Sequence, residues 1–173
     1  VRSSAASDVY KRQVYRNVSP GRDTVISAKG AFAPEIDALL PVPMVVDRWN
    51  ERSALNGLLS AMSEMSVPFV FAVGGDMPYV TSSLIDLLVR ERRDGEEALV
   101  PHHDGGVEPL AALYDRVAFL REGIPVLHSP TPSLQRVIEQ LAHRFIPVPD
   151  KHLFTNLNTE AEYRSALKEL ERR

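Results

Sequence analysis

Short apolar runs alternate with segments of helical character from Thr24 onward, and this alternation restricts the fold more than any other feature. The apolar runs, which we expect to be strands, are Thr24–Ala28, Met44–Asp47, Phe69–Val73, Ala98–Pro101, Leu110–Tyr114 and Phe145–Val148. Strands that alternate with helices build βαβ units, whose mostly parallel sheet is covered by helices on both faces. The sequence therefore predicts an α/β fold.

The segments between these runs contain either apolar residues at helical spacing or residues that cap helices. We expect helices at Pro34–Leu40, from Leu55 to Met65, after Thr81 and Ser82, after Ser133, and after the capping box Thr159–Glu162. The stretch His102–Val107 is expected to be a polar loop. We expect one domain over residues 14–173, and residues 1–13, which lack hydrophobic periodicity, are either non-native or a disordered terminus.

Charge and composition exclude several classes of function. The net charge is −3, from 20 basic and 23 acidic residues, which argues against a nucleic-acid-binding protein. There are no cysteines, so disulfides, thiolate catalysis and cysteine-bound zinc are excluded, and a cytoplasmic location is compatible with the composition. No apolar stretch is long enough to span a bilayer, so we expect no membrane partner.

The strand Phe69–Val73 is followed directly by Gly74-Gly75-Asp76. In open α/β sheets, ligands bind at the carboxyl ends of the strands, which is where this carboxylate is expected to lie. The two glycines remove side-chain bulk, and Mg²⁺ commonly takes one or two carboxylates together with phosphate oxygens. Asp76 is therefore either a metal ligand in a phosphate site or a residue that caps the following helix.

Asp47 ends the strand at Met44–Val46 in the same way, and two readings of it stay open. It either accepts hydrogen bonds from a ribose or base, or caps the following helix. Asn156 and Asn158 likewise either hold a loop through backbone bonds or hold a ligand near a helix N-terminus.

Other catalytic patterns are absent or weak. The sequence contains no glycine-rich loop that ends in Lys-Ser or Lys-Thr and no Gly-x-Gly-x-x-Gly turn, so it carries neither a P-loop nor a dinucleotide-binding motif. The run His102-His103-Asp104 looks like a metal cluster, but adjacent loop residues cannot readily all face one ion. We therefore expect a solvated loop there.

Taken together, the motifs resemble those of the molybdenum cofactor guanylyltransferases, in the order of that family across nearly all of Thr24–Arg173. The matching runs are Val45–Asp47, Ser53–Leu58, Gly75–Tyr79, Asp104–Tyr114 and Phe154–Thr159. Related nucleotidyltransferases share the Asp-Met-Pro and Asn-Leu-Asn-Thr motifs. The Glu-Pro-Leu-Ala-Ala-Leu-Tyr run at Glu108–Tyr114 favours the guanylyl branch over the cytidylyl branch.

The resemblance implies a Rossmann-like three-layer sandwich of the nucleotide-diphospho-sugar transferase type. It implies Mg²⁺ as cofactor, GTP and molybdopterin as substrates, pyrophosphate as product, and transient contact with other proteins of molybdenum cofactor biosynthesis. In the family, the residue matching Asp76 binds Mg²⁺ and nucleotide, and the residue matching Asp47 contacts nucleotide. Ser27 stands where the family commonly has an asparagine that contacts nucleotide. Glu108, Asn156 and Asn158 are expected to contact substrate.

The sequence departs from the family at its front, where the family has a strand and a Leu-Ala-Gly-Gly-x-Ser-x-Arg-Met-Gly-x-Asp-Lys loop. Loops of this kind offset triphosphate charge. Because the chain lacks this loop and the first strand, we expect it to be impaired in GTP binding and turnover. Two alternatives are another small-molecule nucleotidyltransferase, specific for a cytidylyl or sugar-phosphate substrate, and a degenerate nucleotide-binding domain without catalysis.

Overall fold

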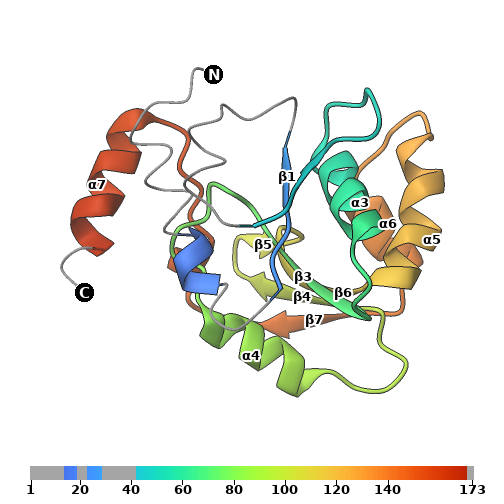
Figure 1. The fold of residues 1–173 in the computed structure, drawn as a ribbon. Coiled ribbons are helices and arrows are strands. Elements are labelled where there is room, and N and C mark those ends of the chain that lie inside the picture. The colour runs from blue at the N-terminus through green and yellow to red at the C-terminus, as the bar shows by residue number, and fades with distance from the viewer. Residues whose placement is uncertain (1–13, 19–22, 29–41, 171–173) are drawn as a thin grey trace.

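A computed structural model describes residues 14–18, 23–28 and 42–170 of the chain. The strands in these residues form two sheets (Figure 1). They are β1 (Ile26–Ala28), β2 (Met44–Val46), β3 (Phe69–Val73), β4 (Ala98–His103), β5 (Gly106–Val107), β6 (Ala111–Asp115) and β7 (His143–Pro147). The expected helix at residues 34–40 and the segment 1–13 lie outside the described residues.

Most strands of the larger sheet share one direction. β3 pairs with β6 and β6 with β4, while β5 and β7 also pair with β4, β7 in parallel. Because β6 is antiparallel to both β3 and β4, the strands β3, β4 and β7 run the same way. A separate sheet holds β1 and β2 in parallel. The α/β class and the mostly parallel sheet are confirmed, with β5 and β6 as the antiparallel members.

The antiparallel members arise from a hairpin where we expected a polar loop, and that expectation is wrong. β4 continues to His103, and after a two-residue turn β5 pairs back on it, with His102 opposite Val107. Gly106 has φ +131°, a conformation that favours glycine and permits this tight reversal. β6 then follows along the same side of β4, with Ala98 opposite Tyr114. A turn at residues 108–110, called the bulge below, separates β5 from β6, and Ala111 N–H donates to the Glu108 carbonyl at 3.1 Å.

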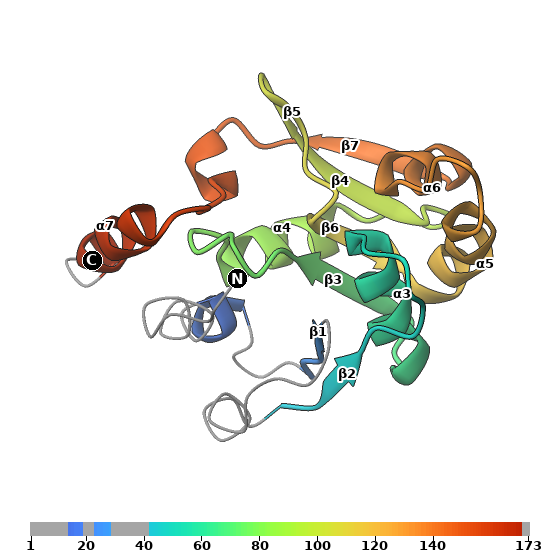
Figure 2. The same cartoon turned by 90° about the horizontal axis from the view of Figure 1, so that it is seen from above.

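Helices cover both faces of the larger sheet (Figure 2). Helices α3 (Ala54–Glu64), α5 (Arg116–Leu127) and α6 (Leu134–Gln140) lie on one face, and α4 (Ser82–Glu91) lies on the other. Alternate side chains of β4 separate the two cores, because Ala98 and Val100 pack toward the first group and Leu99 toward α4. The three-layer sandwich is thereby confirmed. The short helix η1 (Lys151–Phe154) and α7 (Glu160–Leu170) follow β7.

Candidate functional site

The turn that follows β3 holds the Asp76 carboxylate close to its own backbone. Met77 N–H donates to the Gly74 carbonyl at 3.2 Å, which closes the turn. A Cβ atom added at Gly74 would lie 2.7 Å from Asp76 Oδ1, whereas one added at Gly75 would meet nothing within 4 Å. Gly74 is therefore the position whose missing side chain makes room for the carboxylate. No hydrogen bond from the described residues engages the Asp76 carboxylate, which leaves its oxygens available to a cation.

Two further segments converge on this turn. Gly74 N–H donates to the Leu110 carbonyl at 2.9 Å, which brings in the bulge at residues 108–110. Leu157 N–H donates to the Asp76 carbonyl at 3.0 Å, so the exposed residues Asn156 and Asn158 flank Asp76. The structure thus brings the segments that carry Asp76, the two asparagines and Glu108 to one end of the sheet.

The segment after Leu157 is held by the capping box that the sequence predicts. Glu162 N–H donates to Thr159 Oγ1 at 3.3 Å, and Glu162 Oε2 accepts from the N–H groups of Asn158 at 2.8 Å and Thr159 at 2.9 Å. These bonds, that from Asn158 first, lower the pKa of the Glu162 carboxyl below its ordinary value of 4.5. The Asn158 backbone is therefore used structurally, and its exposed side chain remains open to a ligand.

Tyr163 is a residue near the site that the sequence reasoning missed. It packs against a buried cluster that includes Tyr79 and Leu157, and its backbone N–H donates to the Thr159 carbonyl at 3.0 Å. Burial raises the pKa of the Tyr163 phenol, and the charge of Asp76 raises it further, so the phenol lies within electrostatic range of that carboxylate. The available signal was its position one helical turn after the capping Thr159.

A second group forms where β1 and β2 end. Ser27 Oγ–H donates to Asp47 Oδ1 at 2.8 Å, so two of the residues expected to contact nucleotide are bonded to each other. A Cβ atom added at Gly57 of α3 would lie 3.4 Å from Ser27 Oγ and 3.6 Å from Asp47 Oδ1. The glycine therefore lets the backbone of α3 lie close to the Ser27–Asp47 pair.

A buried amide fixes the segment that follows Asp47. The Asn56 side chain donates to the carbonyls of Trp49 at 2.5 Å and Glu51 at 2.7 Å, and its Oδ1 accepts from Ser60 Oγ at 3.1 Å. Ser60 in turn accepts from Arg48 N–H at 2.9 Å, and both Asn56 and Ser60 are fully buried. These bonds hold the chain from Arg48 to Glu51 against α3.

The corrected hairpin also changes the environment of His103. Its Nε2 lies 2.8 Å from Glu108 Oε1, and the His103 side chain is only 10% exposed. His102 and Asp104 are exposed, as expected for a solvated segment, whereas the side chain of His103 is largely buried. Within the described residues, no group of three histidine or acidic side chains forms a metal cluster.

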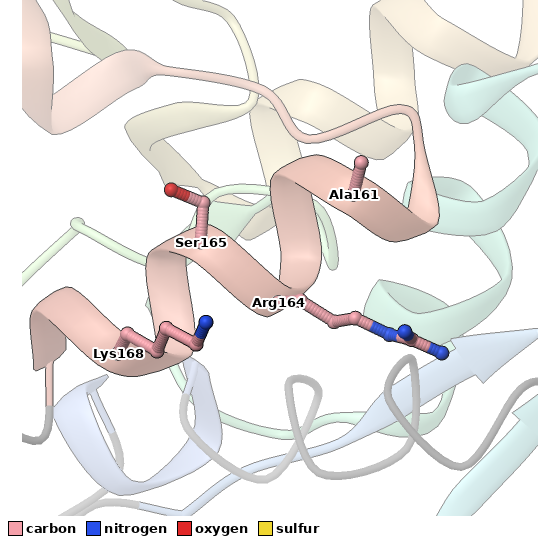
Figure 3. A pocket seen from close by; sticks show the side chains of 4 residues that line it. All are labelled: Ala161, Arg164, Ser165 and Lys168. Carbon is pink, nitrogen blue, oxygen red and sulfur yellow. The ribbon is translucent and has the colours of Figure 1, made fainter.

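One face of α7 carries positive charge. Four side chains on successive turns line an open hollow of about 470 Å³ (Figure 3), and they are Ala161, Arg164, Ser165 and Lys168. The helix that begins beside Asp76 therefore carries two cations on one face. Among the helices of the described residues, none has the length and apolar character needed to cross a membrane.

These features define an α/β domain with polar side chains at the carboxyl ends of strands, which is where ligands bind in open α/β sheets. The sequence profile described as MobA-like NTP transferase domain matches residues 11–145. The chain belongs to this family of nucleotidyltransferase domains.

Individual relatives carry the name molybdenum cofactor guanylyltransferase. One from Natranaerobius thermophilus is 30% identical over 127 residues, which cover 69% of this chain and 62% of the relative. Another from Bacillus mycoides is 26% identical over 157 residues, which cover 86% of this chain and 77% of the relative. The chain thus spans less than two thirds of the length of the Natranaerobius relative.

Solved structures show the same fold. Molybdopterin-guanine dinucleotide biosynthesis protein A from Archaeoglobus fulgidus superposes with a TM-score of 0.78 at 20% identity, over 95% of this chain and 86% of that one. The 2-C-methyl-D-erythritol 4-phosphate cytidylyltransferase from Thermus thermophilus superposes with a TM-score of 0.65 at 13% identity, over 95% and 87%. The expected nucleotide-diphospho-sugar transferase type of fold is confirmed.

Proposed function

We propose that this protein is a molybdenum cofactor guanylyltransferase, which transfers GMP from GTP to molybdopterin with Mg²⁺ and releases pyrophosphate. The observation that carries the proposal is the Asp76 carboxylate, folded over Gly74 at the end of β3 and flanked by the bulge at residues 108–110 and by Asn156 and Asn158. The names of the relatives supply the choice of GTP and molybdopterin.

The residues at Asp76 fit a magnesium ion. Mg²⁺ prefers hard oxygen ligands and is commonly held by one or two carboxylates plus substrate phosphates and water. Asp76 offers a carboxylate that accepts no hydrogen bond from the described residues, at a turn where Gly75 adds no side chain. When bound, Mg²⁺ would supply charge neutralisation for the triphosphate.

The remaining groups have roles that follow from their chemistry. Asp47 has Oδ1 engaged by Ser27, so Oδ2 remains to accept a hydroxyl or N–H donor of the nucleotide. A molybdopterin phosphate oxygen forms the new bond to the α-phosphorus of GTP, the bond from that phosphorus to the bridging oxygen breaks, and pyrophosphate leaves. The nucleophile is already an anion, so no protein nucleophile or covalent intermediate is needed. Asn156 and Asn158 offer amide donors to the acceptor.

The sequence printed here contains no glycine-rich loop of the family type. We expect a version with that loop joined ahead of Val14 to bind GTP more tightly and turn over faster than the printed chain. A preformed loop supplies backbone donors to the phosphates at a lower ordering cost than scattered side chains. Comparing the two versions by calorimetric titration tests this point.

A competition assay tests the proposed function. The loop-bearing protein is given equal GTP and CTP with molybdopterin and Mg²⁺, and both dinucleotide products and pyrophosphate are quantified. We expect the GMP adduct to dominate. Faster consumption of CTP would assign the protein to the cytidylyl branch, and binding of nucleotide without any transfer would identify a degenerate domain.

A further inference from the structure

The ring of His103 joins three segments that surround the site. Its Nδ1 accepts from the Gly105 N–H at 2.9 Å, and its Nε2 lies 2.8 Å from Glu108 Oε1. The ring also stacks on Phe154, with centroids 5.4 Å apart and planes 12° apart. The His103 and Glu108 side chains are 10% and 20% exposed, so both partners are largely shielded from solvent.

The two nitrogen contacts fix which nitrogen carries the proton. Nδ1 accepts a hydrogen bond from Gly105, so it must be unprotonated, and the proton of the neutral ring lies on Nε2. The Nε2–H group therefore donates to Glu108 Oε1. This bond fixes the rotamer of Glu108 and leaves Oε2 to accept hydrogen bonds from a ligand.

The backbone places this pair beside Asp76. In the β3–β6 ladder Val73 lies opposite Ala111, and the bond from Gly74 to Leu110 continues the same register. Glu108 therefore follows on the side of β3 where the Asp76 turn lies. Phe154, on which the His103 ring stacks, precedes Asn156 by two residues. One imidazole thus supports both Glu108 and the segment that carries the asparagines.

We propose that His103 is a positioning residue, which orients Glu108 to recognise the heterocycle of the acceptor molybdopterin. This inference rests on the proposed function. A carboxylate with one oxygen fixed accepts the N–H donors of a planar heterocycle, as acidic side chains do with nucleobase edges, while it repels phosphate. Ser27 and Asp47, which are proposed to contact the nucleotide, belong to the other sheet. Glu108 shares one end of the larger sheet with the asparagines that are proposed to contact the acceptor, so we assign it to the pterin ring of molybdopterin.

Two substitutions separate the contacts of His103. In His103→Gln the side-chain amide replaces the Nε2–H donor to Glu108, and in His103→Asn the amide oxygen replaces the Nδ1 acceptor for Gly105. Affinity for molybdopterin is measured by its fluorescence, affinity for GTP by calorimetry, and folding by thermal melting. We expect His103→Asn to weaken molybdopterin binding by about tenfold. His103→Gln should retain most of the affinity, and GTP affinity should stay the same in both variants.

The outcomes distinguish this inference from the proposed function. Equal loss of molybdopterin affinity in both variants, or an equal loss of GTP affinity, overturns the role of His103 alone. A loop-bearing protein that binds neither GTP nor molybdopterin overturns the proposed function. An independent test is the ¹⁵N imidazole spectrum, in which we expect His103 as the Nε2–H tautomer, with its Nε2 signal shifted in Glu108→Gln. An Nδ1–H tautomer would contradict the arrangement directly.

Discussion

Asp47 and Asp76 both end a strand, but the structure surrounds them differently. Asp47 is already bonded to Ser27, and the chain after it is fixed by the buried Asn56. Asp76 accepts no side-chain hydrogen bond within the described residues, and only its backbone carbonyl is engaged, by Leu157. The first arrangement suits recognition of a neutral hydroxyl or N–H donor, and the second suits a cation, which needs free carboxylate oxygens.

The largest effect is expected from Asn56→Ala, because the Asp47 region depends on an internal network. The substitution leaves the carbonyls of Trp49 and Glu51 and the buried hydroxyl of Ser60 without this partner, which should lower the free energy of unfolding by about 3 kcal/mol. Chemical denaturation measures this change, and Asn50→Ala at an exposed neighbouring position is the control. A loss similar to that of the control would show that the network does not hold the region.

A smaller effect, confined to binding, is expected from Gly74→Ala, because the Asp76 region depends on an uncrowded turn. The new Cβ would lie 2.7 Å from Asp76 Oδ1, so the carboxylate must rotate away. We expect Mg²⁺-dependent GTP affinity to fall about tenfold, or about 1.4 kcal/mol, with little change in melting temperature. Gly75→Ala adds a Cβ that meets nothing within 4 Å and should bind normally. Equal affinities in the two variants would show that Gly74 does not determine the position of the Asp76 carboxylate.

The smallest effect concerns the acid sensitivity of the segment beside Asp76. The pKa of Glu162 is lowered, chiefly by the Asn158 N–H. The stability that this carboxylate contributes to the segment is therefore complete above its unfolded pKa of about 4.5 and is lost as the pH falls through the lowered folded pKa. Hydrogen exchange at Asn158 and Thr159 should therefore become faster than at other helix starts below about pH 4.5. Glu162→Gln should show the faster exchange already at neutral pH, while Glu139→Gln on α6 should not. Acid-independent protection would contradict this reading.

The fold was largely predictable because most strands and helices are continuous in sequence and have strong periodicity or caps. Ser133 caps α6 as expected, through its hydroxyl and Arg136 N–H. Helix α5 has no counterpart among the expected helices, because Gly123 and Pro125 interrupt its apolar pattern. It forms because Asp115 caps it and Ala118 and Phe119 are buried against the sheet. Tertiary packing overrides local propensity there.

The candidate site was predictable at the single residues that end strands, and less so where distant segments meet. Asp47 and Asp76 follow apolar runs and needed only the rule for strand ends. The contacts of His103 with Glu108 and Phe154 depend on the β4–β5 hairpin and on the path after β7, which sequence spacing does not encode. Likewise, the approach of Tyr163 to Asp76 requires the chain after β7 to return to the Asp76 turn, where Leu157 N–H donates to the Asp76 carbonyl.

The central claim is that the Asp76 carboxylate holds Mg²⁺ together with the nucleotide. Calorimetric titration of GTP with and without Mg²⁺, on the loop-bearing wild-type protein and on its Asp76→Asn variant, tests it most directly, because the substitution removes the charge and keeps the shape. We expect Mg²⁺ to strengthen GTP binding by about tenfold or more in the wild type and to have almost no effect in the variant. An equal enhancement by Mg²⁺ in both proteins would contradict the claim.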